Sequence, residues 1–227
     1  MKRIRFKKKG WTKSFYINKL IDLMIVVVGV TVAFQLNNLK ERSDQRNLER
    51  FYLEGILADL GKDMDAYNNI LKSLESDQRM ATGALDRLAD AQYVNDSLGS
   101  ALVSIMSLNT FRSNSSTYTT LLNGNGMSAI RNTEIRNLIS DHYDQYRPIY
   151  RFESVYTEVL LKLFDYASAY CDFTTAKIVD STIGDRVQTK NMLLVVRAQL
   201  DDGIGQYNRS LEKANDLTSS IRAYLRE

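Results

Sequence analysis

A twenty-residue apolar segment, Leu20–Leu39, lies near the N-terminus and reads LIDLMIVVVGVTVAFQLNNL. Its centre, residues 23–34, contains no charged side chain, and no comparable run occurs elsewhere in the chain. An α-helix rises about 1.5 Å per residue, so twenty residues span about 30 Å, the thickness of the hydrocarbon core of a bilayer. Because a helix in lipid satisfies its own backbone hydrogen bonds, residues 20–39 predict a transmembrane helix.

The charges that flank this segment predict its orientation. Eight basic residues and no acidic residue precede Leu20, whereas basic and acidic side chains are mixed after Leu39. The cytoplasmic side of a membrane span carries the excess of Lys and Arg. We therefore expect residues 1–19 to form a basic cytoplasmic tail that contacts anionic lipid, and residues 40–227 to form a domain outside the cytoplasm.

A cleaved signal peptide is the alternative interpretation of the N-terminus. It also combines a basic region with an apolar region, and Thr31 and Ala33 offer small residues for cleavage. Three features favour a retained anchor instead: the length of the basic region, the charge of Asp22 at the start of the apolar run, and the continuation of the helical pattern through Leu36.

The net charge of +3 conceals two regions of opposite sign. Residues 1–22 carry +7, and the remaining 22 basic and 26 acidic residues sum to −4. The basic character therefore belongs to the tail beside the membrane, and we expect no nucleic-acid partner.

The rest of the chain predicts an all-α fold, because Pro148 is its only proline and apolar residues recur at spacings of three and four. We expect the transmembrane helix to continue into an extracytoplasmic antiparallel helical bundle, with a coiled-coil-like seam and an end near Tyr93. A last helix, residues 188–226, returns beside it, with Gly203 and Gly205 as a weak point. The stripe of the first helix comprises Leu53, Leu57, Leu60, Met64, Tyr67, Leu71, Leu74, Gln78, Ala81, Leu85 and Leu88.

Breaks between the remaining helices follow from polar residues, Gly and Pro. Residues 94–97 are expected to end the first helix, and residues 98–108 to form a short apolar helix. Residues 109–116 and 174–189 are expected to be connections. The Asn-Gly-Asn-Gly run at 123–126 suggests a turn with positive φ, Asn132 or Thr133 is expected to cap a helix, and Pro148 is expected to kink or break one.

Few residues suit catalysis or metal binding. His142 is the only histidine, which excludes a site with several His ligands, and Cys171 is the only cysteine, which excludes an internal disulfide. A nucleophilic pair of Cys171 with His142 has the residue types but no surrounding motif, and we expect a buried thiol and a packed histidine. We therefore expect no cofactor, no metal and no enzymatic activity.

Four residues of the apolar helix are candidates for contacts within the membrane. Asp22 and Gln35 mark the two interfaces, and Asp22 is either solvated at the interface, paired with Lys19, or in contact with a polar group of a neighbouring span. Gly29 and Ala33 form a small-xxx-small pattern, which permits close approach of another helix but is short and common.

Three stretches resemble an uncharacterised family of bacterial single-pass membrane proteins that carry a domain of unknown function. They are IVVVGVTVAFQLNN, ERFYLEGILADLGKDM, and the run from Tyr118 through Gly126 and Asn132 to Arg136, within a resemblance that covers about residues 15–145. The resemblance implies a Gram-negative inner membrane, a periplasmic helical domain, and neither an activity nor catalytic residues. Where the family's span often carries Glu near the cytoplasmic edge, this chain has Asp22.

These observations favour a non-enzymatic, membrane-anchored periplasmic protein that serves as an accessory or scaffold subunit of an envelope assembly. Its expected partners are membrane lipid and other envelope proteins or further copies of itself. The alternative is a sensory or ligand-binding helical bundle, and an enzyme is the third possibility.

Overall fold

The computed structural model describes residues 13–124 and 126–226, and it confirms an essentially all-α chain in which a long N-terminal helix precedes a helical region. Most of the expected basic tail, residues 1–12, lies outside this range. The chain divides into two compact units, residues 1–49 and residues 50–227, which are described separately.

Helix α1 (Lys13–Arg87) forms the described part of the first unit and the first helix of the second. In the first unit, every large apolar side chain from Leu20 to Leu36 is exposed. The expected continuation of the helix beyond residue 39 is confirmed, but the helix ends at Arg87 rather than near Tyr93. The reason is Asp90, whose carboxylate accepts hydrogen bonds from the backbone N–H groups of Gln92 and Tyr93 and so caps a new helix.

The segment that follows α1 remains helical, so the prediction of a break at residues 94–97 was wrong. It consists of α2 (Ala91–Tyr93), the π-helical turn η1 (Val94–Leu98) and α3 (Gly99–Ile105). Residues 107–115 then form the expected connection, which is extended and contains no helix. The remaining elements are α4 (Ser116–Asn123), α5 (Gly126–Ala129), α6 (Thr133–Asp144), α7 (Tyr146–Ala167), β1 (Cys171–Asp172), β2 (Lys177–Ile178), η2 (Ser181–Asp185) and α8 (Val187–Tyr224).

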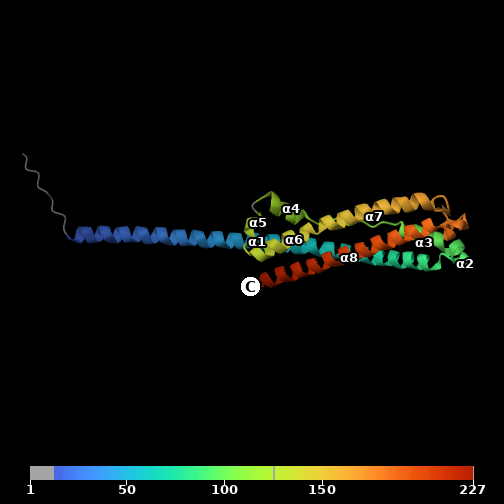
Figure 1. Ribbon diagram of the computed structural model, residues 1–227. Coiled ribbons are helices and arrows are strands. Elements are labelled where there is room, and N and C mark those ends of the chain that lie inside the picture. Colours follow the sequence, from blue (N-terminus) through green and yellow to red (C-terminus); the bar gives the residue numbers. More distant parts are fainter. Residues whose placement is uncertain (1–12, 125, 227) are drawn as a thin grey trace, which may run out of the picture. The chain divides into compact units, whose positions relative to one another are not determined.

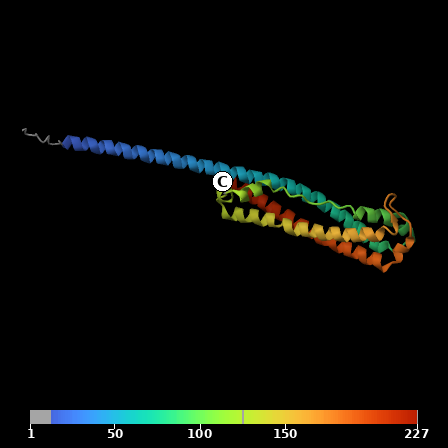
Figure 2. The same cartoon turned by 90° about the horizontal axis from the view of Figure 1, so that it is seen from above.

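Within the second unit, α1 and α7 run in the same direction, and α8 runs antiparallel to both (Figures 1 and 2). The part of α1 from residue 50 runs toward the end of the unit that carries α2 and α3. Residues 107–115 return as an extended strap, α6 and α7 run outward again, and α8 returns. The unit therefore has the up-and-down order that the sequence predicts, but its second leg is an extended segment instead of a helix.

The buried face of α1 keeps the first series of the predicted stripe and, except for Leu71, which is buried as predicted, shifts the second series. The first series, Leu53, Leu60, Tyr67, Leu74, Ala81 and Leu88, is buried as expected. The second series lies one residue earlier than predicted and comprises Ile56, Asp63, Ile70, Asp77 and Ala84, whereas Leu57, Met64, Gln78 and Leu85 are only half-buried. Both series repeat every seven residues, as in a helix seam. The shift brings two carboxylates into the interior.

Local signals elsewhere match the structure with two exceptions. The side chain of Asn132 caps α6 as expected, and Pro148 lies in the first turn of α7, where a missing N–H costs nothing. Asn123, Gly124 and Gly126 do not use the positive φ that we predicted, because Ala176 is the only described residue with positive φ, and Asn125 lies outside the described residues. Gly203 is not a weak point, since it is buried against the ring of Phe152.

Candidate functional site

The four predicted membrane-contact residues lie on the exposed part of α1. At 100° per residue, Asp22, Gly29 and Ala33 share one face of the helix, and Gln35 points elsewhere. The Asp22 carboxylate lies 3.6 Å from the Lys19 ammonium, which confirms the predicted pair. A Cβ at Gly29 would meet no described atom within 4 Å, so this face is open to another helix.

Two buried carboxylates of α1 bond to the end of the strap, residues 107–115, and to the first turn of α4, which follows it. Oδ1 of Asp63 accepts hydrogen bonds from the backbone N–H and the side-chain amide of Asn114, both at 2.8 Å, and its Oδ2 accepts one from the hydroxyl of Tyr146. Oδ2 of Asp59 accepts a hydrogen bond from the backbone N–H of Thr117 at 3.0 Å. These acids therefore satisfy backbone groups that an extended segment without a partner strand would otherwise leave unpaired.

A third buried carboxylate, Glu153 of α7, holds the middle of the strap. Its Oε1 accepts hydrogen bonds from the backbone N–H of Phe111 and, at 2.7 Å, from the hydroxyl of Tyr207. The ring of Phe111 enters an aromatic cluster, with its centroid 4.7 Å from that of Tyr67 and 5.4 Å from that of Tyr146. The cluster and its acids join α1, the strap, α7 and α8 into one core.

Burial shifts the pKa of several groups in this core. Desolvation raises the pKa of Asp63 and raises that of Asp77 to about 6. Desolvation, with the nearby charge of Lys213, lowers the pKa of His142 to about 4. The imidazole is 1% exposed and its Nδ1 has no hydrogen-bond partner among the described residues. His142 is thus the packed, neutral histidine that we predicted.

These shifts affect stability with opposite signs. The pKa of Asp77 lies above its ordinary 3.8, so the folded chain binds this proton more tightly than the unfolded chain, and the fold gains stability as the pH falls through 6 toward 4. The pKa of His142 lies below its ordinary 6.5, so the unfolded chain binds that proton more tightly, and stability is lost as the pH falls from 6.5 toward 4.

Cys171 and His142 do not meet. His142 belongs to α6, whereas Cys171 lies beyond the far end of α7, whose 22 residues span about 33 Å. The thiol is buried, as expected, and burial together with Asp172 raises its pKa. Among residues 13–124 and 126–226, no group of three or more His, Cys, Asp and Glu side chains is arranged to hold a metal ion.

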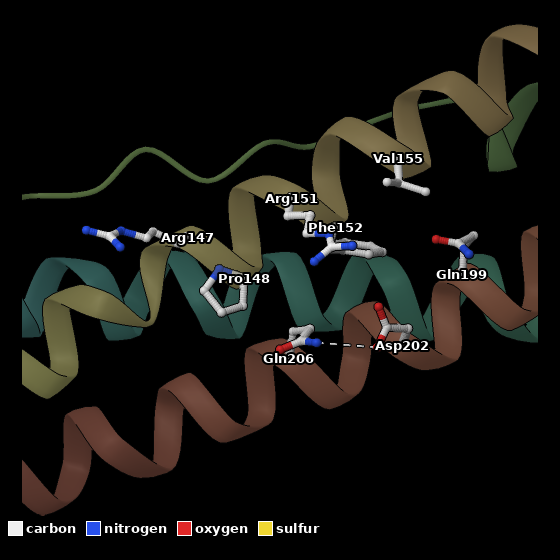
Figure 3. A pocket seen from close by; sticks show the side chains of 8 residues that line it. All are labelled: Arg147, Pro148, Arg151, Phe152, Val155, Gln199, Asp202 and Gln206. Carbon is white, nitrogen blue, oxygen red and sulfur yellow. Dashed lines mark hydrogen bonds between the residues drawn. The ribbon is translucent and has the colours of Figure 1, made fainter.

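An open groove runs along the outer face of α7 and α8 (Figure 3). One part is polar and is lined from α7 by Arg147 and Arg151 and from α8 by Asp202 and Gln206, above the ring of Phe152. The part nearer the hairpin is apolar and is lined by Val159, Leu163, Val187, Met192, Val195 and Val196, with Lys162, Gln188 and Asn191 at its edge. The sequence analysis predicted no groove between these helices; the outward-facing valines of both helices were the available signal.

The fold defines a class of protein: an all-α chain whose exposed apolar N-terminal helix could cross a membrane by its length and composition. No known family model matches the chain, and neither a curated protein nor a solved structure matches it.

Proposed function

We propose that this chain is a membrane-anchored scaffold or accessory protein of a bacterial envelope assembly, with residues 20–39 in the inner membrane and residues 40–227 in the periplasm. The observation that carries the proposal is the exposure of the apolar segment near the N-terminus. Its most apolar 18 residues have a mean hydropathy of 2.0, and the rest of the chain buries none of them. A face of this size is unfavourable in water and favourable in lipid.

The second unit supports a role in binding macromolecules rather than in catalysis. Its buried acids are engaged in fastening the strap, and the groove on α7 and α8 lies open at the surface instead of enclosing a small molecule. A sensory or ligand-binding bundle is the alternative. A small molecule that raises the unfolding temperature of the full-length chain by binding would favour it.

Membrane fractionation tests the anchor. The double variant Val26→Arg/Val30→Arg adds about 5–7 kcal/mol to the free energy of inserting the helix, so it is expected to leave the carbonate-resistant membrane fraction. Val179→Arg, which changes an equally exposed valine of the second unit, is the matched control and stays in the membrane. If the double variant fractionates like the wild type, the proposed span is wrong.

Topology and partners need separate measurements. Alkaline phosphatase fused after residue 227 should be active, since the proposal places that end in the periplasm, and a fusion before residue 1 should be inactive. Affinity purification of the detergent-solubilised chain should recover a stoichiometric envelope protein or a defined oligomer. A strictly monomeric chain without partners would contradict the scaffold role.

A further inference from the structure

The groove between α7 and α8 exposes more apolar surface than a solvated helix pair requires. The side chains of Val187, Val195 and Val155 are 72%, 48% and 40% exposed, and all three line the groove. Val187 and Val195 line the apolar part of the groove together with the buried Leu163 and Val196, whereas Val155 lines the polar part. Contiguous exposed apolar surface of this kind marks a protein interface.

The polar part of the groove carries one charge of each sign at the same level of the bundle. Arg151 on α7 and Asp202 on α8 flank the point where Phe152 packs against Gly203 (Figure 3). Arg151 has no ion-pair partner within the described part of the chain, and Asp202 accepts only a 3.4 Å hydrogen bond from Gln206. Both charges are therefore available to a partner.

This arrangement is complementary to itself when two copies pack in parallel. In a two-fold pair, α7 of each copy faces α8 of the other, so Arg151 of each copy lies opposite Asp202 of its mate. The valines then meet at the same level as well, with Val159 facing Val195. An antiparallel pair would instead place the guanidinium of Arg151 against the apolar part of the groove, where its burial is unfavourable.

We propose that the α7/α8 groove is the interface of a parallel two-fold dimer of this chain, closed by two reciprocal Arg151–Asp202 ion pairs and by the valines. A parallel pair also brings the residue-50 ends of both copies to the same end of the dimer, which suits two chains anchored in one membrane, and in this respect the inference rests on the proposed function. It adds to that function the partner, the surface and the register.

Charge reversal tests the ion pairs with the full-length chain in detergent. In a dimer of Arg151→Asp, or of Asp202→Arg, both ion pairs are replaced by contacts between like charges. The dissociation constant of the dimer, measured by analytical ultracentrifugation, should therefore rise about tenfold or more. A mixture of the two variants restores opposite charges at both contacts, and the mixed dimer should regain the wild-type affinity. This recovery shows that both variants fold. A monomeric wild type, unchanged self-association of either variant, or a mixture that fails to associate would overturn the proposal.

Cysteine cross-linking in membranes tests the register. In a Cys171→Ser background, one tagged chain carries Val159→Cys and a second carries Val195→Cys, and a disulfide between the two chains is expected. Gln206→Cys in place of Val195→Cys is the matched control, because Gln206 lies about 16 Å along α8 from Val195. Cross-linking of the control pair, or capture of a different protein at Val195→Cys in place of a second copy, would overturn the proposal.

The outcomes separate the two proposals. If Val26→Arg/Val30→Arg fractionates like the wild type while the charge-reversal test succeeds, the anchor is refuted and the dimer is kept. A chain that stays in the membrane but shows neither mixed-dimer recovery nor the expected disulfide refutes the dimer and keeps the anchor.

Discussion

Gly203 of α8 lies directly against the ring of Phe152 of α7, and replacing it with alanine should destabilise the fold. A Cβ at this position would lie 2.2 Å from Cζ of the ring and 2.6 and 2.7 Å from its two Cε atoms. The ring has little room to move, because it is buried, stacks on Tyr156 at 5.5 Å between centroids and meets Tyr207 edge-on at 6.3 Å.

The magnitude follows from two opposing terms. Alanine stabilises the interior of a helix by about 1 kcal/mol relative to glycine. Overpacking a well-filled core costs about 1–3 kcal/mol, and the rigid ring places Gly203→Ala in the upper half of that range. The free energy of unfolding should therefore fall by about 1–2 kcal/mol, which lowers the melting temperature of a unit of this size by about 2–8 °C.

Urea unfolding of the full-length chain in mild detergent measures this effect, with the near-ultraviolet circular dichroism of the tyrosines as the signal of the folded bundle. Gly61→Ala in α1 is the matched control, because a Cβ there meets no described atom within 4 Å. It should stabilise the chain by about 0.5–1 kcal/mol. If both variants stabilise the chain equally, the close packing of α7 on α8 at Gly203 is refuted.

Three further changes test the buried polar groups. Asp77→Asn should raise the free energy of unfolding by about 2 kcal/mol at pH 7, and this gain should disappear between pH 6 and 4. A gain that does not depend on pH would contradict the raised pKa of Asp77. His142→Gln should reduce the loss of stability between pH 6.5 and 4, and unfolding curves at a series of pH values measure both effects. Asp63→Ala should destabilise the chain by about 2–4 kcal/mol and speed amide hydrogen exchange at Asn114, whereas the exposed Asp65→Ala should do neither.

The sequence allowed the fold class and the long helices to be predicted, because those depend on local periodicity. The apolar run 20–39, the stripe of α8 and the cap at Asn132 each needed only residues within a few turns of one another. Local periodicity also explains why the predicted end of the first helix was wrong. Apolar residues continue the helical pattern on both sides of Asp90, and this pattern conceals the cap that Asp90 provides.

The buried acids could not be predicted, because their partners are distant in the sequence. Asp63 bonds to Asn114 and Tyr146, and Glu153 bonds to Phe111 and Tyr207, so each carboxylate is satisfied only after three segments meet. A charged residue normally marks a solvated face. The prediction for α1 therefore placed Met64 and Gln78 on the buried face in place of their neighbours Asp63 and Asp77. The one available signal was the spacing of fourteen between Asp63 and Asp77, which is two heptads. The α7/α8 groove was missed because the polar residues along it mask its valines.

The strap has a consequence for the order in which the chain acquires its structure. Backbone groups of the strap at Phe111 and Asn114 bond to side chains of α7 and α1, and Thr117 just beyond it bonds to α1. None of these bonds exists until the two helices stand side by side, so we expect residues 107–115 to be the last segment to order during folding and the first to open. Such a local unfolding unit would open the aromatic core between α1 and α7 while the helices themselves persist.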